Sequence, residues 1–202
     1  MQEIYILFSI VILIFSAIIH EVAHGAMANW LGDPTARLAG RLTLNPFKHI
    51  DPIGSVLLPV ALALSGLPVF GYAIPVPFNP YNLRGGKWGP ALVAVVGPLS
   101  NLLIAIFFGL VLRFSAISGN LADAFATIVF VNLTLAVFNI IPIPPLDGSK
   151  VLFAVLPYKF QKVEKYLEQY RWALLFILIF FAWQFILPVV LKLFTLIIGI
   201  TA

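Results

Sequence analysis

The residues most suited to catalysis or metal binding are His20-Glu21-Val22-Ala23-His24, which match the pattern H-E-x-x-H. On a helix, side chains four residues apart lie on the same face, so both imidazoles can bind one zinc ion. Glu21 is close enough to accept a proton from a water that the ion activates. The pattern therefore predicts a hydrolytic zinc centre. The alternative is a helix whose polar residues line the interior of a bundle.

A catalytic zinc ion usually takes three protein ligands and leaves a fourth position for water, so this centre needs another ligand. The chain has no cysteine, which restricts the choice to histidine, aspartate and glutamate. The candidates are His49, Asp51, Asp123 and Asp147. Asp147 is favoured because it follows Pro144 and Pro145, where a broken helix leaves irregular backbone that can line a cavity.

Each of these candidates also has a structural role open to it. Asp147 could cap a short helix that begins at Ser149, which is a common use of aspartate. His49 and Asp51 fit an interfacial loop, and Asp123 fits the start of a helix. The residue types alone therefore leave the third ligand open, with Asp147 preferred.

The composition places these polar residues in a membrane protein. Hydrophobic residues make up 61% of the 202-residue chain and charged residues only 10%, whereas a soluble domain has about 25% charged residues. The mean hydropathy is +1.05. The net charge is +4, but the basic residues lie in loops between apolar runs. That distribution indicates orientation in a lipid bilayer and not nucleic-acid binding.

Several apolar segments predict the helices that must position the site. Residues 4–31, 88–114 and 121–141 are long enough to span a bilayer, which takes about 20 apolar residues. Residues 172–200 form either one kinked helix or a hairpin. Residues 56–69 are too short to span and are expected to be re-entrant or interfacial.

A proline-rich stretch, residues 71–86, interrupts the helices. Its prolines forbid a helix, and the alternation of apolar residues from Tyr72 to Phe78 suggests an extended edge strand. The expected fold is an all-α polytopic membrane protein, a bundle of about four to six transmembrane or re-entrant helices with this membrane-associated strand segment. We expect a single domain over 1–202, with a core at 4–156 and a C-terminal hydrophobic segment at 172–200.

Three motifs together resemble the site-2 protease family of intramembrane zinc metalloproteases. They are HEVAH in a first span, GPLSN at residues 97–101 in a middle span, and NIIPIPPLDG at residues 139–148. The stretch GRLTLNPFKHIDPIG at residues 40–54 resembles the short prokaryotic members without added soluble domains.

This resemblance implies roles for named residues. His20, His24 and Asp147 would hold one Zn²⁺ per chain, and Glu21 would be the general base. Asn139 and Asn101 would correspond to polar residues near the active site, in substrate contact or oxyanion support. The alternative for both asparagines is hydrogen bonding between helices.

The resemblance also implies a function and a location. The chain would hydrolyse peptide bonds in or near the transmembrane segments of membrane-protein substrates, within a prokaryotic cell membrane. The alternatives are a metal or solute transporter with an intramembrane His/Glu/Asp site, and an inactive scaffold of the same family. The polar groups gather at one end of their spans and no internal repeat is visible, which favours the protease over the transporter.

The zinc hypothesis constrains the topology, because Asp147 must lie at the same membrane face as the histidines. This holds if residues 56–69 dip into the membrane and return. Ten of the twelve Lys and Arg residues then share one face, with Arg113 and Lys192 elsewhere. By the positive-inside rule, the catalytic face is expected to be cytoplasmic and the N-terminus external.

Overall fold

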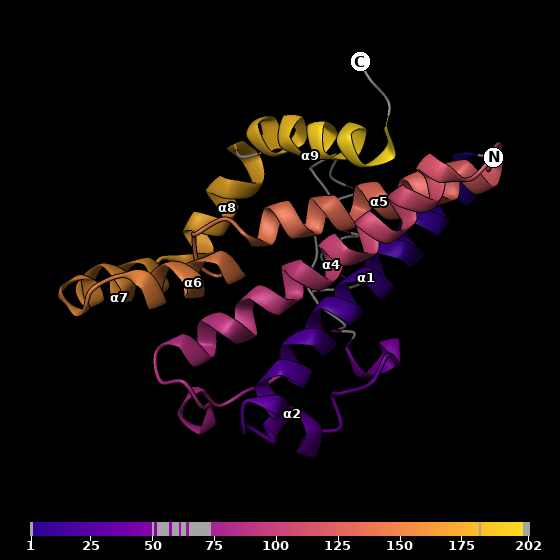
Figure 1. Ribbon diagram of the computed structural model, residues 1–202. Coiled ribbons are helices and arrows are strands. Elements are labelled where there is room, and N and C mark those ends of the chain that lie inside the picture. The colour runs from indigo at the N-terminus through magenta and orange to yellow at the C-terminus, as the bar shows by residue number, and fades with distance from the viewer. Residues whose placement is uncertain are drawn as a thin grey trace.

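The computed structural model describes residues 2–49, 51, 57, 61, 64, 74–181 and 183–199, and this part of the chain is largely helical with no β-strand. Three helices are long and apolar enough to cross a membrane: α1 (Gln2–Trp30), α4 (Trp88–Phe114) and α5 (Asn120–Asn139). They pack against one another as a bundle (Figure 1). The predicted all-α polytopic fold is therefore confirmed. The predicted re-entrant segment at 56–69 falls almost entirely outside the described residues.

An exposed apolar stripe runs along α4 and shows how the bundle meets its solvent. Five residues of this stripe are each more than 40% exposed and follow one another at intervals of three or four residues, which places them on one face of the helix: Leu92, Val95, Leu99, Leu103 and Phe107. A water-soluble protein rarely exposes so continuous an apolar surface. The stripe suits contact with lipid, and the composition and the helices together make the chain an integral membrane protein.

The packed core lies where α4, α5 and α9 (Trp183–Ile198) meet. Ala105 of α4, Leu133 of α5 and Val190 of α9 are completely buried there. Gly109 of α4 lies against Ile197 of α9 so closely that a Cβ atom would collide with it. Small residues at such contacts let membrane helices approach one another, because close packing takes over from the hydrophobic effect within lipid.

The C-terminal apolar segment forms two helices, α8 (Arg171–Phe181) and α9, whose axes meet at an angle of 64°. The sequence is compatible with either one kinked helix or a hairpin over residues 172–200. The structure has a sharp bend, and Pro188 lies inside α9 and not at the bend. Figure 1 shows α9 lying across the top of the bundle, with α8 leading down to the shorter helices.

The chain enters α4 at the same end of the bundle at which it leaves α1. The backbone N–H of Arg84 donates to the carbonyl oxygen of Leu31 (2.8 Å), and Leu83 packs with Ala28 and Leu31. Short helices lie at this end: α2 (Thr35–Leu38), η1 (Pro46–Lys48) and η3 (Pro80–Asn82). This placement matches the topology in which the intervening segment returns to the face it left.

A buried carboxylate, that of Asp33, ties these short segments together. Its oxygens accept hydrogen bonds from the hydroxyl of Thr35 (2.6 Å), the side-chain amide of Asn82 (3.0 Å) and the backbone N–H of Asn79 (2.6 Å). Burial alone would raise the pKa of Asp33, but the hydrogen bonds outweigh it and hold the pKa below its usual value. The sequence indicates only that the first helix ends just before Asp33, and gives no sign of these hydrogen bonds.

The broken segment after α5 leads into α6 (Asp147–Val155), η4 (Tyr158–Phe160) and α7 (Gln161–Gln169). Gly148 lets α6 begin directly against the end of α5, because a Cβ atom there would collide with the backbone of Ile140 and Ile141. Residue 147 thus comes back toward the bundle, beside α4, and reaches the neighbourhood of α1.

Candidate metal centre

Three side chains from distant parts of the chain converge inside the bundle. His20 and His24 lie one turn apart on α1 and are almost fully buried, with 6% and 8% of their surface exposed. The carboxylate oxygen Oδ2 of Asp147 lies 3.0 Å from Nε2 of His20 and 3.3 Å from Nε2 of His24. The two Nε2 atoms are themselves 3.0 Å apart. Among the described residues, this is the group of acidic and histidine side chains that could hold a metal ion.

The hydrogen bonds on the outer side of each imidazole fix where its proton lies. Nδ1 of His24 is 2.7 Å from the carbonyl oxygen of Val93, which can only accept, so this nitrogen donates. Nδ1 of His20 is 2.7 Å from Oδ1 of Asn101. The amide nitrogen of Asn101 donates to the carbonyl oxygen of Ser16 (3.2 Å), so Oδ1 must be the acceptor toward His20. Each neutral histidine therefore presents the lone pair of Nε2 to the centre.

The resulting donor set fits a metal cation. Two imidazole lone pairs and a carboxylate oxygen face one another with no hydrogen atom between them, and Oδ2 of Asp147 is buried without a hydrogen-bond donor. A shared cation would relieve this repulsion. Ligand atoms about 2.0–2.1 Å from a tetrahedral zinc ion lie about 3.3 Å apart, close to the separations observed. The ligand types, nitrogen and oxygen without sulfur, also suit zinc.

Gly97 of α4 forms one wall of this centre. A Cβ atom at this position would collide with the imidazole rings of both His20 and His24. The space is therefore kept free by the absence of a side chain. Gly97 is the first residue of the GPLSN motif, but its role could not be predicted from the sequence, because glycine has no side chain that indicates a chemical function.

Glu21 lies beside the two histidines on α1 and is only partly buried. Its Oε2 accepts a hydrogen bond of 2.9 Å from the backbone N–H of Val76. Val76 belongs to residues 74–79, which run past α1 without regular secondary structure, so the predicted edge strand is not formed in the described part of the proline-rich stretch. Gly25 of α1 permits this approach, since a Cβ atom there would lie 2.6 Å from the side chain of Val76.

The remaining candidates for the third ligand lie elsewhere or have other partners. His49 is buried, and its Nε2 donates to the carbonyl oxygen of Thr43 (2.8 Å). Asp123 lies in the first turn of α5, at the end of the helix far from Asn139. Neither of these two, nor Asp51, belongs to the group of possible ligands that converge. Asp147 itself begins α6, and the capping position is held by Leu146.

The two asparagines predicted near the site differ in their surroundings. Asn101 is fully buried, and both ends of its amide are bonded within the bundle, which agrees with the alternative of hydrogen bonding between helices. Asn139 is half-buried at the end of α5, where its amide nitrogen donates to the carbonyl oxygen of Leu135 (3.0 Å). A role for Asn139 in substrate contact stays a prediction.

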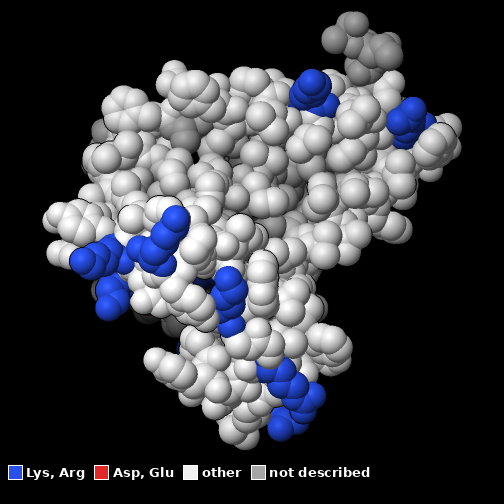
Figure 2. Space-filling view, turned by 60° about the vertical axis from the view of Figure 1, so that its left-hand side comes forward, with Lys and Arg blue, Asp and Glu red and all other residues white. Residues whose placement is uncertain are grey.

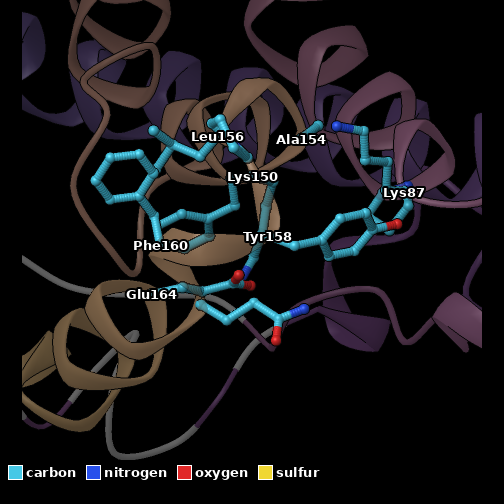
Figure 3. A pocket seen from close by; sticks show the side chains of 11 residues that line it. Lys87, Lys150, Ala154, Leu156, Tyr158, Phe160 and Glu164 are labelled. Atoms are coloured by element: carbon cyan, nitrogen blue, oxygen red, sulfur yellow. The ribbon is translucent and has the colours of Figure 1, made fainter.

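A separate cavity of about 250 Å³ lies further along α6, away from the histidines. Figure 3 shows Lys87, Lys150, Tyr158 and Glu164 around it. Lys150 is paired with Glu168, whose oxygen lies 2.5 Å from its ammonium group. None of the three converging ligands lines this cavity, so it is distinct from the candidate metal centre.

The sequence is similar to a family of peptidases and to several named proteins. Residues 113–181 match the family described as Peptidase family M50. The chain is 40% identical over 157 residues to "Putative zinc metalloprotease YwhC" of Bacillus subtilis, covering 73% of this chain and 68% of that protein. It is 32% identical over 169 residues to "Putative zinc metalloprotease Rip2" of Mycobacterium tuberculosis, covering 82% of this chain and 63% of that protein. No solved structure matches the chain.

Proposed function

The chain belongs to peptidase family M50, the site-2 protease family, and we propose that it is an intramembrane zinc metalloprotease with its active site at His20, His24, Asp147 and Glu21. Its relatives are named as zinc metalloproteases, which supports a metallopeptidase that uses zinc. The single observation that supports the site most strongly is the convergence of two imidazole lone pairs and one carboxylate oxygen.

The depth of the centre supports cleavage within the membrane. His20 and His24 lie ten and six residues before the end of α1 at Trp30, which is about 9–15 Å along the helix axis. The substrates would accordingly be membrane proteins cut in or near their transmembrane segments. A substrate helix must unwind to reach such a site, because its peptide bonds are otherwise shielded by their own hydrogen bonds.

The chemistry of each side chain indicates its role in the proposed reaction. One zinc ion per chain, held by His20, His24 and Asp147, would supply Lewis acidity that activates water and polarises the scissile carbonyl. Glu21 accepts a proton from the attacking water and delivers it to the leaving amine nitrogen. The N–H of Val76 holds one carboxylate oxygen of Glu21, which leaves the other oxygen for proton transfer. The outer hydrogen bonds to Asn101 and Val93 keep both imidazoles in the tautomer that can bind metal.

The charge distribution supports a cytoplasmic catalytic face. Some basic side chains on the face in Figure 2 lie near the top and at the upper right, but most lie along its lower and left-hand parts. These parts correspond to the end of the bundle where α2 and α7 lie in Figure 1. Under the positive-inside rule this end faces the cytoplasm.

The test of the base is Glu21→Gln, measured on protein reconstituted in vesicles with a single-span model protein that has a fluorescent tag at each end. Glutamine keeps the size of the side chain but cannot take up the proton. We expect zinc content to be unchanged and cleavage to fall by about 10²–10⁴-fold. Glu164→Gln, on α7 and outside the candidate metal centre, is the matched control and should cleave normally. Substantial cleavage by Glu21→Gln would reject Glu21 as the base.

A further inference from the structure

A chain of buried polar side chains connects three helices behind His20. It comprises Ser16 of α1, Asn101 of α4 and Asn132 of α5, and at least 95% of the surface of each is buried. All three lie within the long, predominantly apolar helices that could cross a membrane. Polar groups at membrane depth are costly unless they are paired, so their gathering at one point calls for a specific role.

The hydrogen bonds of this chain have a defined direction. The amide nitrogen of Asn132 donates to the carbonyl oxygen of Ile128 (2.9 Å) and to the hydroxyl of Ser16 (2.9 Å). Because the carbonyl of Ile128 can only accept, Oδ1 of Asn132 must point the other way, toward Asn101. There it accepts from the amide nitrogen of Asn101 (2.9 Å).

The orientation of Asn132 in turn fixes the orientation of Asn101, which faces the candidate ligand His20. The same amide nitrogen of Asn101 also donates to the carbonyl oxygen of Ser16, so two acceptors hold its orientation. Oδ1 of Asn101 then faces Nδ1 of His20 at 2.7 Å and requires a proton there. A reversed Asn101 would turn its N–H groups toward Nδ1 and favour the proton on Nε2, where it would block metal binding.

We propose that Asn132 and Ser16 are positioning residues of the metal centre, which act through Asn101 to keep the proton of His20 on Nδ1 and the lone pair of Nε2 available to zinc. This inference rests on the proposed function, since it concerns the affinity of the same centre. It assigns a role to two residues that neither touch the ion nor lie in the motifs that predicted the site. Groups that orient metal-bound histidines commonly contribute 10–100-fold to metal affinity.

The test is Asn132→Leu, which keeps a side chain of similar size but removes both the acceptor for Asn101 and the donor to Ser16. We expect zinc affinity, measured by competition with a chelator in detergent, to fall by about tenfold or more. The visible absorption of the Co²⁺-loaded protein should change as well, because a misaligned His20 alters the coordination. Thr134→Val is the matched control. Among the described residues its hydroxyl donates to the carbonyl of Phe130 in the same helix, so affinity and spectrum should stay as in the wild type.

A purely structural role predicts a different result. If Asn132→Leu lowers the melting temperature but leaves zinc affinity and the Co²⁺ spectrum unchanged, Asn132 only joins helices and the inference is overturned. If the variant does not accumulate, Asn132→Ala adds no bulk and is measured instead, with the same expectation. Wild-type protein that binds no zinc would overturn the proposed function together with this inference. Wild-type protein that binds zinc, with variants of equal affinity, would overturn the inference alone.

Discussion

At the residue scale, the candidate centre depends on hydrogen bonds that fix the orientation and the tautomer of its two imidazole rings. The carbonyl oxygen of Val93 accepts a hydrogen bond from Nδ1 of His24, and Oδ1 of Asn101 accepts one from Nδ1 of His20. Both Nε2 lone pairs therefore face the carboxylate of Asp147. Both histidines and Asn101 are buried, and in such low-dielectric surroundings a hydrogen bond is stronger and an unpaired polar group is more costly than in water. The chemistry of the site is therefore set by its outer contacts as much as by the ligands.

Gly97→Ala tests whether the space between the histidines is needed. The added methyl group would collide with both imidazole rings, so the rings or α4 must shift. We expect zinc affinity to fall by at least about tenfold, measured by chelator competition, while the helical content stays unchanged. Ser100→Ala, one turn further along α4, is the control, because the hydrogen bond of its hydroxyl in the described part of the chain goes to the backbone carbonyl of Gly97 in the same helix. Wild-type affinity in Gly97→Ala would show that the centre is not built as described.

The sequence predicted the residues of the site unevenly, for physical reasons. His20 and His24 follow from local geometry, since residues four apart on a helix always share a face. Asp147 could only be favoured, because its approach to α1 depends on contacts between segments more than 120 residues apart in the chain. Asn132 and Ser16 could not be found, since a lone polar residue in an apolar run has many uses. Whether the three converging residues bind zinc stays a prediction.

At the scale of elements, the long helices were predicted closely and the short segments between them were not. Hydropathy is a local property, so α1, α4 and α5 could be located from it, and the bounds of α4 agree exactly with the predicted 88–114. The bend between α8 and α9 depends on packing against the core, and Pro188 gave no guide to it. The hydrogen bonds of the buried Asp33 also depend on tertiary contacts, because two of their donors, Asn79 and Asn82, lie far along the chain.

Asp33→Asn tests whether the hydrogen bonds of this buried carboxylate stabilise the fold. Asparagine has one acceptor oxygen in place of two and no charge, so at least one bond to Thr35, Asn79 or Asn82 is lost. We expect the free energy of unfolding at pH 7 to fall by about 1–3 kcal/mol, measured by thermal unfolding in detergent. Asp123→Asn, at an exposed position in the first turn of α5, is the control and should change stability by less than about 0.5 kcal/mol.

The loss of stability in Asp33→Asn should depend on pH, and the lowered pKa of Asp33 gives the direction. The pKa of Asp33 is lowered in the folded protein, so its ionised form stabilises the fold above the unfolded pKa of about 3.9, and this stabilisation is lost as the pH falls through the folded value. The difference in stability between wild type and Asp33→Asn should thus shrink as the pH is lowered from 5 toward 3. A difference that stays constant over this range would contradict the role given to the carboxylate.

At the scale of the whole molecule, the fold brings the start of α6 back to the C-terminal part of α1, where His20 and His24 lie. The chain leaves α1 and enters α4 at one end of the bundle, α5 returns to that end, and the broken segment after α5 sends Asp147 inward. This path is what the topological argument from sequence required. The organisation of the chain as a single domain, and the orientation of the catalytic face, stay predictions.

The central claim is that this path creates one zinc site from His20, His24 and Asp147. The most direct measurement is the zinc content per chain of the purified protein in detergent, by elemental analysis, for the wild type and for Asp147→Ala, with Asp123→Ala as control. The account predicts about one zinc ion per chain in the wild type and the control, and little or none in Asp147→Ala. Full zinc content in Asp147→Ala, or no zinc in metal-replete wild-type protein, would contradict it.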